Sequence, residues 1–114
     1  MKAISIDELK DKIRDITLID VRTPYEYEFG HIEGAENIPF EDLEEGFKKK
    51  YTTEKKDIVI YAENEDMGTQ AAKKLEYIGY NNVELYEKGF QEWKRSKLPI
   101  KRMSLGQERR TRKI

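Results

Sequence analysis

The sequence predicts one α/β domain built around a parallel β-sheet. Short runs of β-type residues alternate along the chain with segments of helical periodicity, which is typical of βαβ units. The clearest strand, 57–61, is an almost unbroken apolar run, as expected where helices cover both faces of a sheet. With 114 residues, the chain has room for only one compact sheet.

The first predicted elements are a helix and a strand. Ser5 and Glu8 match the capping-box pattern that starts a helix, and an apolar face continues from there to Ile16. Residues 17–21 follow as a short strand without clean alternation, which again indicates that both of its faces are covered.

Three weaker elements come next. Pro24 favours a brief helix that ends near Gly30, because proline is well tolerated in the first helical turn. Residues 35–38 form a candidate strand that is closed by a proline. Apolar residues at helical spacing, beginning with Phe40, predict a further helix over 40–47.

The second half of the chain gives stronger signals. Residues 71–78 carry apolar side chains at helical spacing, and Gly79 stands where a left-handed C-terminal cap is common. Residues 83–86 are predicted to form a strand. A last helix begins at Gly89, and its Trp93 is expected in the core.

Charge is distributed unevenly along the chain. Residues 101–114 hold six cations against one glutamate, a local charge of +5, which leaves −6 for residues 1–100 in a chain of net charge −1. We therefore predict a domain over 1–100 and a basic, flexible tail over 101–114, with an electrostatic tether to an acidic partner as the alternative role of the tail. An acidic body is a poor surface for nucleic acid, and no apolar run approaches the ~20 residues of a membrane span.

Residue usage limits the chemistry of the chain. It contains no cysteine, which excludes disulfides, thiolate metal sites and any mechanism in which this chain supplies a cysteine nucleophile. The single histidine and the scattered carboxylates lack the spacing of a zinc or calcium site, so we expect neither a metal nor a cofactor. The first eight residues turn acidic before a signal-peptide stretch could form, and we expect a cytoplasmic protein.

Residues 20–39 resemble the first signature of rhodanese-like domains. The family pattern runs D-V-R, then E, then G-H-I-x-G-A-x-N-I-P, and every one of these positions is filled here. A second family signature resembles residues 83–93, although one of its usual paired glycines is Lys88 in this chain. The resemblance covers residues 1–100.

The resemblance implies a parallel five-stranded sheet with helices on both faces and an active-site loop after the strand at 58–61. This position also has a physical reason, because ligands of open α/β sheets gather at the carboxyl ends of the strands, near helix N-termini. In active members of the family a cysteine opens this loop and carries sulfur as a persulfide, and an arginine commonly closes the loop five positions later.

The corresponding loop of this chain has neither residue. Ala62 stands where the family has its nucleophile, and Met67 stands near the usual arginine. An alanine methyl group cannot ionise or carry sulfur, so the chain as written cannot perform cysteine-dependent sulfur transfer. Three carboxylates and no cation in the loop should also repel an anionic donor. The complete loop comprises Ala62, Glu63, Asn64, Glu65, Asp66 and Met67.

Structural roles follow from the resemblance for Asp20, Arg22, Glu26 and His31. Asp20 and Arg22 are expected to form a charge pair that holds the turn after the strand. His31 would need a correctly placed serine or cysteine nucleophile to act as a catalytic base, and the chain offers none. We therefore expect His31 to orient its loop through hydrogen bonds.

Two hypotheses for the function follow. The first is a non-catalytic binding or regulatory module whose loop takes a small anionic or sulfur-carrying ligand or a protein partner. The second is a thiosulfate or persulfide sulfurtransferase in which Ala62 replaces a native cysteine. The missing arginine and the acidic loop favour the first hypothesis, whereas the intact first signature favours the second. A related phosphatase or arsenate reductase is a weaker alternative, because the loop of those enzymes is typically longer and richer in glycine and arginine.

Overall fold

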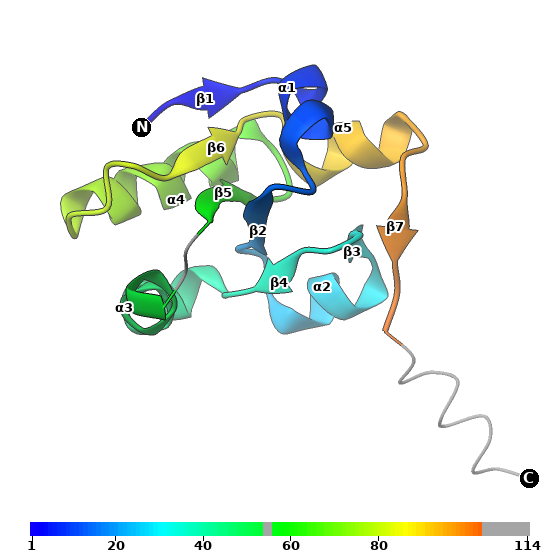
Figure 1. Cartoon of the computed structure of the whole chain (residues 1–114). Helices are drawn as coiled ribbons and strands as arrows, with labels where there is room; N and C mark the ends of the chain where they lie inside the picture. Colours follow the sequence, from blue (N-terminus) through cyan, green and yellow to red (C-terminus); the bar gives the residue numbers. More distant parts are fainter. Residues whose placement is uncertain (54–55, 104–114) are drawn as a thin grey trace, which may run out of the picture.

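The computed structural model, which describes residues 1–53 and 56–103, shows a five-stranded parallel sheet with helices on both faces (Figure 1). The strand order is β1-β6-β5-β2-β4, and each neighbouring pair is parallel. Strands β3 and β7 form a separate antiparallel pair. The predicted fold class is therefore confirmed. In chain order the elements are β1 (Ala3–Ile4), α1 (Ile6–Lys12), β2 (Ile16–Asp20), α2 (Pro24–Phe29), β3 (His31–Ile32), β4 (Glu36–Asn37), the 3₁₀ helix η1 (Phe40–Asp42), α3 (Leu43–Thr53), β5 (Asp57–Tyr61), α4 (Glu65–Tyr77), β6 (Glu84–Tyr86), α5 (Gly89–Arg95) and β7 (Ile100–Lys101).

The central strand β5 is covered on both faces, as its sequence predicts. Ile58 and Ile60 pack into a cluster with side chains of α3 and α4. Val59 and Tyr61 point to the opposite face and pack with side chains of α1 and α5. An unbroken apolar run is therefore required here, because both sets of alternate residues are buried.

Two helices differ from the sequence prediction. Helix α1 ends at Lys12, so Ile16 does not continue its apolar face and is instead the first residue of β2. Helix α3 extends to Thr53, beyond the predicted end at 47, and it begins only after the short 3₁₀ helix that contains Phe40. Phe40 is 38% exposed, whereas Leu43 and Phe47 are fully buried, so the three do not share one buried helical face.

The other predicted elements are present, and the largest change in an end is at α4, which begins at Glu65 and not at 71. The strand predicted over 35–38 is reduced to β4, and the strand predicted over 83–86 begins one residue later. Gly79 has a φ of +105°, which is the left-handed conformation expected after α4. Trp93 is buried in the core.

Three strands of two residues each, β1, β3 and β7, were not predicted from the sequence. Strand β1 adds to the edge of the sheet, where the Lys2 carbonyl accepts a hydrogen bond from the N–H of Leu85. Strand β7 pairs with β3, and the N–H of Met103 then donates to the Glu28 carbonyl. Residues 101–103 of the predicted tail thus run along the domain, and the rest of that tail lies outside the described residues. None of the helices in the described part of the chain has the length and apolar character needed to cross a membrane.

The capping box predicted for α1 is formed. The Glu8 N–H donates to Ser5 Oγ at 3.2 Å, and the Ser5 N–H donates to Glu8 Oε1 at 3.0 Å. These hydrogen bonds satisfy two backbone donors that would otherwise lack a partner at the helix start. The hydrogen bond from the Ser5 backbone is the main reason that the pKa of Glu8 is lowered from its ordinary value of 4.5.

We expect Ser5→Ala to destabilise the domain by about 1 kcal/mol, because the Glu8 N–H loses its acceptor. Urea unfolding followed by the fluorescence of Trp93 measures this change. Because the pKa of Glu8 is lowered on folding, the ionised Glu8 carboxylate stabilises the folded state above pH 4.5. This stabilisation is lost as the pH falls through the lowered pKa of the folded state. Ser96→Ala is the matched control, since the Ser96 hydroxyl makes no hydrogen bond within the described residues and the change should stay within about 0.5 kcal/mol.

Candidate functional site

The candidate site lies where the two central strands end. Asp20 of β2 is in register with Tyr61 of β5, and the Val21 N–H donates to the Tyr61 carbonyl at 3.0 Å. The turn that follows β2 is therefore beside Ala62, the residue that follows β5. In open α/β sheets the crevice at the carboxyl ends of such strands is where ligands bind.

A buried ion pair with Asp20 fixes Arg22 in this turn. Arg22 Nε donates to both carboxylate oxygens of Asp20 at 3.1 Å, and Nη2 donates to Oδ2 at 2.8 Å. The same Nη2 also donates to the Gly30 carbonyl at 2.6 Å. Burial alone would lower the pKa of Arg22, but the hydrogen bonds and the charge of Asp20 raise it, so the guanidinium remains charged. The pair expected from the sequence is thus present and is shielded from solvent.

Tyr61 extends this polar network to the next loop. Its hydroxyl donates to Asp20 Oδ2 at 2.6 Å and accepts a hydrogen bond from the Ile32 N–H at 3.0 Å. Burial first, and then the charge of Asp20, raises the pKa of Tyr61 well above its ordinary value. The hydroxyl therefore stays protonated, and it joins β5 and β2 to the segment that contains β3.

The loop that follows β5 leads directly into α4. Asn64 caps this helix, because its Oδ1 accepts from the Met67 N–H at 3.0 Å and its carbonyl accepts from the Gly68 N–H at 3.0 Å. Among the described residues there is no acceptor for the N–H groups of Glu65 and Asp66. The loop therefore retains the geometry of a helix N-terminus at the end of a central strand.

The start of α5 is packed against this loop. The Phe90 N–H donates to the Ala62 carbonyl at 2.9 Å, and the Gln91 N–H donates to the Glu63 carbonyl at 3.1 Å. Gly89 has a φ of +76°, and a Cβ added to it would lie 2.6 Å from the Ala62 carbonyl oxygen. Only glycine fits there, both for its backbone conformation and for this close approach.

Two of the three loop carboxylates are paired with cations from outside the loop. Arg22 Nη1 donates to Glu63 Oε1 at 3.1 Å, and Lys88 Nζ donates to Glu65 Oε1 at 3.0 Å. Asp66 has no cationic partner within the described residues. The loop therefore carries less uncompensated negative charge than its sequence suggests. Arg22 and Lys88, which compensate Glu63 and Glu65, are engaged in these ion pairs and are not free to bind an anionic ligand.

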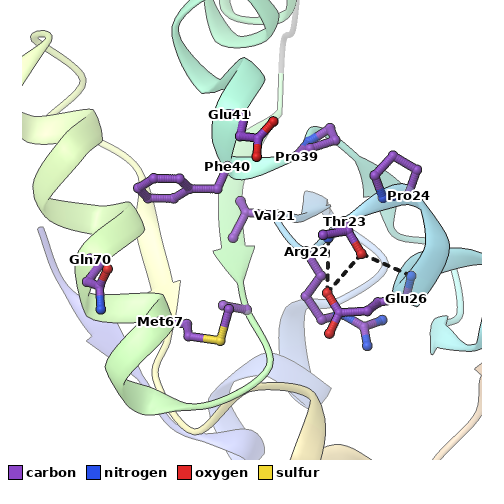
Figure 2. Close-up of a pocket in the computed structure, with 11 residues that line it drawn as sticks. Val21, Arg22, Thr23, Pro24, Glu26, Pro39, Phe40, Glu41, Met67 and Gln70 are labelled. Atoms are coloured by element: carbon purple, nitrogen blue, oxygen red, sulfur yellow. Dashed lines mark hydrogen bonds between the residues drawn. The ribbon is translucent and has the colours of Figure 1, made fainter.

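A cavity of about 220 Å³ opens beside Ala62. Figure 2 shows Phe40 reaching across it towards α4, which contributes Met67 and Gln70. Most of its lining is apolar, and Phe40 and Met67 are partly exposed at 38% and 44%. The described residues that line it are Val21, Arg22, Thr23, Pro24, Glu26, Pro39, Phe40, Glu41, Ala62, Met67 and Gln70.

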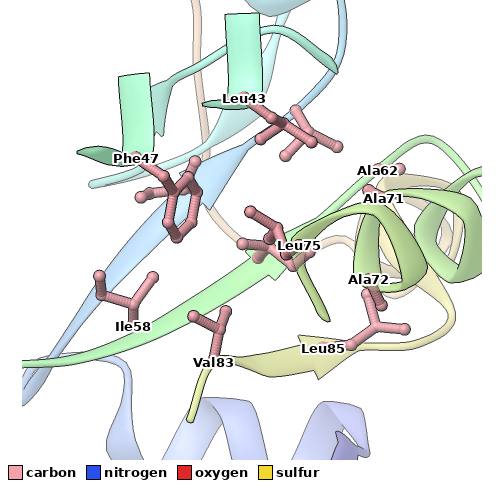
Figure 3. Close-up of a cluster of buried hydrophobic side chains, with 12 residues drawn as sticks. Leu43, Phe47, Ile58, Ala62, Ala71, Ala72, Leu75, Val83 and Leu85 are labelled. Atoms are coloured by element: carbon pink, nitrogen blue, oxygen red, sulfur yellow. The ribbon is translucent and has the colours of Figure 1, made fainter. Parts of the chain in front are cut away.

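Ala62 belongs to both the cavity and the core. Its side chain is 1% exposed and is part of the apolar cluster under α4, where Figure 3 shows it beside Ala71. Ala62 is nevertheless one of the residues that line the cavity. Position 62 therefore lies at the boundary between the core under α4 and the cavity.

The other two predicted site residues support the turn between β2 and β3. His31 is 3% exposed, its Nδ1 lies 2.8 Å from the Tyr27 carbonyl oxygen, and its ring stacks on the Tyr27 ring at 3.7 Å. Glu26 Oε1 accepts from the N–H and the hydroxyl of Thr23 at 3.2 Å and 3.0 Å, which caps α2. Glu26 lines the cavity, whereas His31 does not.

A protein-family model described as a rhodanese-like domain matches residues 5–96. The chain belongs to the rhodanese-like domain family. The chain is 34% identical over 93 residues to the uncharacterised protein YqhL of Bacillus subtilis, a match that covers 82% of this chain and 72% of YqhL.

Solved rhodanese-like structures share this fold. The rhodanese-like domain of the Alr3790 protein from Anabaena sp. has a TM-score of 0.78 at 28% identity, over 90% of this chain and 80% of that one. The human single-domain sulfurtransferase TSTD1 has a TM-score of 0.70 at 28% identity, over 83% of this chain and 96% of that one.

Within this rhodanese-like framework the structure adds contacts that the sequence could not reveal. The pairs Arg22–Glu63 and Lys88–Glu65 join residues 41 and 23 positions apart, and no local pattern links them. The one available signal was Lys88 itself, which stands at a position where the family signature has a glycine. Among the described residues, no group of three or more His, Cys, Asp or Glu side chains is arranged to hold a metal ion.

Proposed function

We propose that this chain is a rhodanese-like domain that binds a protein partner at the cavity beside Ala62 and does not transfer sulfur. The observation that carries the proposal is the alanine methyl group at the end of β5, in a loop whose helix-capping geometry is otherwise intact. The chain contains no cysteine, and therefore no thiol that could carry sulfur at another position. A cytoplasmic location, expected from the sequence, is part of the same proposal.

The charges around the cavity also support binding without sulfur transfer. Arg22 is the cation among the described lining residues, and its donors are directed to Asp20, Glu63 and the Gly30 carbonyl. Met67 provides an apolar thioether where active relatives commonly have an arginine. An anionic sulfur donor would therefore enter an apolar site without a free cation, and that raises its free energy.

A second function is favoured by one specific observation. Ala62 lines the cavity and opens the loop that leads into α4, so a cysteine at this position would stand beside a helix N-terminus. Helix N-termini lower the pKa of a nearby thiol. The alternative is therefore a sulfurtransferase in which Ala62 replaces a native cysteine, and the similarity to the human single-domain sulfurtransferase is consistent with it.

The rate of sulfur transfer from thiosulfate to cyanide separates the two functions. The reaction requires a thiolate to attack the outer sulfur of thiosulfate, release sulfite and pass the sulfur from the resulting persulfide to cyanide as thiocyanate. We expect no thiocyanate formation above background by the unchanged chain. We also expect Ala62→Cys to remain at least about a hundredfold below an active single-domain sulfurtransferase assayed in parallel, because no free cation stabilises the donor.

The control is Ser96→Cys, which places a thiol on the exposed end of α5 and reports the reactivity of a cysteine outside the site. Turnover by Ala62→Cys at a rate comparable with the active enzyme would overturn the proposal and establish the alternative. Turnover by the unchanged chain would contradict both functions.

A further inference from the structure

The cavity beside Ala62 has the size of one side chain. Its volume of about 220 Å³ is below the ~300–1,000 Å³ of pockets that enclose drug-sized ligands. Phe40 and Met67 lie at its partly exposed edge, and methionine adapts its shape readily to different apolar groups. These features suit the insertion of one apolar side chain better than the binding of a complete cofactor.

The charged groups that line the cavity indicate which charges would flank the inserted side chain in the partner. Glu26 and Glu41 line the cavity, and neither has a cationic partner within the described residues. Arg22 is neutralised by Asp20 and Glu63. Lys74 is not a lining residue, and its ammonium donates to the Phe40 carbonyl at 3.2 Å and lies 4.5 Å from the centroid of the Phe40 ring. The unpaired charge of the lining is therefore negative.

From these features we propose that the cavity binds a segment of a partner protein in which one apolar side chain is flanked by lysine or arginine. The apolar side chain fills the space between Phe40 and Met67, and the flanking cations lie against Glu26 and Glu41. The inference rests on the proposed function, because it names the chemistry of the partner that this same site binds. Charge complementarity of this kind gives an interface its specificity.

A second hollow next to the cavity indicates how the partner segment runs across the surface. Tyr25 and Phe29 of α2 are 69% and 63% exposed, and their rings meet edge to face with centroids 4.9 Å apart. They line this second hollow together with Lys94 and Arg102. Exposed aromatic residues are enriched at binding hot spots. Because Glu26 lines both hollows, a cation held against Glu26 lies next to this aromatic pair, and the bound segment runs from Glu41 across the cavity towards it.

Fluorescence anisotropy with labelled synthetic peptides tests the inference on the full chain. The first probe has one leucine between two pairs of arginines. In the second probe a glycine replaces the leucine, and in the third the arginines are replaced by glutamates. We expect the first probe to bind, and each of the other two to bind at least about tenfold more weakly, because one loses the buried side chain and the other the charge complementarity.

The variant Glu41→Arg tests whether the probe binds at the cavity, because Glu41 is one of the lining residues. We expect this variant to weaken binding of the first probe about tenfold, because an attraction becomes a repulsion. The control is Glu44→Arg, which makes the same change of net charge at an exposed position on α3 outside the cavity lining, and it should change the affinity less than about twofold. Equal effects of the two variants would reduce the interaction to general charge attraction and overturn the inference.

Failure of this inference can be distinguished from failure of the proposed function. If no arginine-containing probe binds, or if the glutamate probe binds as tightly as the first, the partner chemistry is wrong, whatever the sulfur-transfer assay shows. If Ala62→Cys transfers sulfur rapidly while the first probe binds as expected, the non-catalytic function is wrong and the peptide site stands.

Discussion

Replacement of Asp20 by asparagine is expected to destabilise the domain by about 3–5 kcal/mol. The substitution keeps the shape of the side chain but removes the charge that compensates the buried guanidinium of Arg22. Removing one partner of a buried ion pair is costly because the remaining charge is poorly solvated. Here the guanidinium would keep only Glu63, which contacts Nη1. Because domains of this size are stable by only about 5–15 kcal/mol, this variant should be close to unfolding at physiological temperature.

Urea unfolding followed by the fluorescence of Trp93 measures the effect, with Asp11→Asn as the control for loss of one carboxylate on the exposed face of α1. The control should change the stability by less than about 0.5 kcal/mol. Tyr61→Phe should fall between the two, at about 1–3 kcal/mol, because it leaves the Ile32 N–H without its acceptor. A loss of less than about 1 kcal/mol for Asp20→Asn would show that the buried Asp20–Arg22 ion pair is not a main source of the stability of the domain.

Gly89→Ala is expected to cost about 2–4 kcal/mol. Part of this cost, about 1–2 kcal/mol, comes from placing a side chain at a φ of +76°. The remainder comes from the added Cβ, which would lie 2.6 Å from the Ala62 carbonyl oxygen and must push the loop away from α5. The same variant should therefore also weaken peptide binding at the cavity.

Gly79→Ala separates the two causes. Gly79 has a φ of +105°, but a Cβ at that position meets nothing within 4 Å. It should therefore cost only about 1–2 kcal/mol and leave peptide binding unchanged. Thermal unfolding and the anisotropy assay on both variants test this expectation, and equal losses of stability and of binding in the two variants would show that contact with the loop does not matter.

Most of the fold could be predicted because buried positions require apolar residues, and their spacing in the sequence differs between strands and helices. The apolar run of β5 and the helical spacing on α4 follow directly from which faces are covered. The very short strands β1, β3 and β7 have no such spacing, because two residues cannot show a period. The end of α3 was also missed, because three lysines follow Phe47 in the sequence and do not continue its apolar spacing.

The candidate site was predictable in position but not in its charges. Ala62 and the start of α4 could be located because the family signature and the rule for strand ends agree. The pairing of Glu63 with Arg22 depends on the register of β2 and β5, which brings residues distant in sequence together. A count of loop charges therefore overstated the free negative charge, and the cavity lining could be recognised only from the fold.

The most direct test of the central claim is whether a sulfur atom can be loaded onto position 62. Ala62→Cys is incubated with thiosulfate, and intact-mass spectrometry detects any addition of one sulfur atom. We predict no persulfide on Ala62→Cys and a detectable persulfide once Met67→Arg is added, because the second change supplies the cation that the site lacks. Stoichiometric persulfide on Ala62→Cys alone would contradict the claim that this rhodanese-like site no longer accepts an anionic sulfur donor.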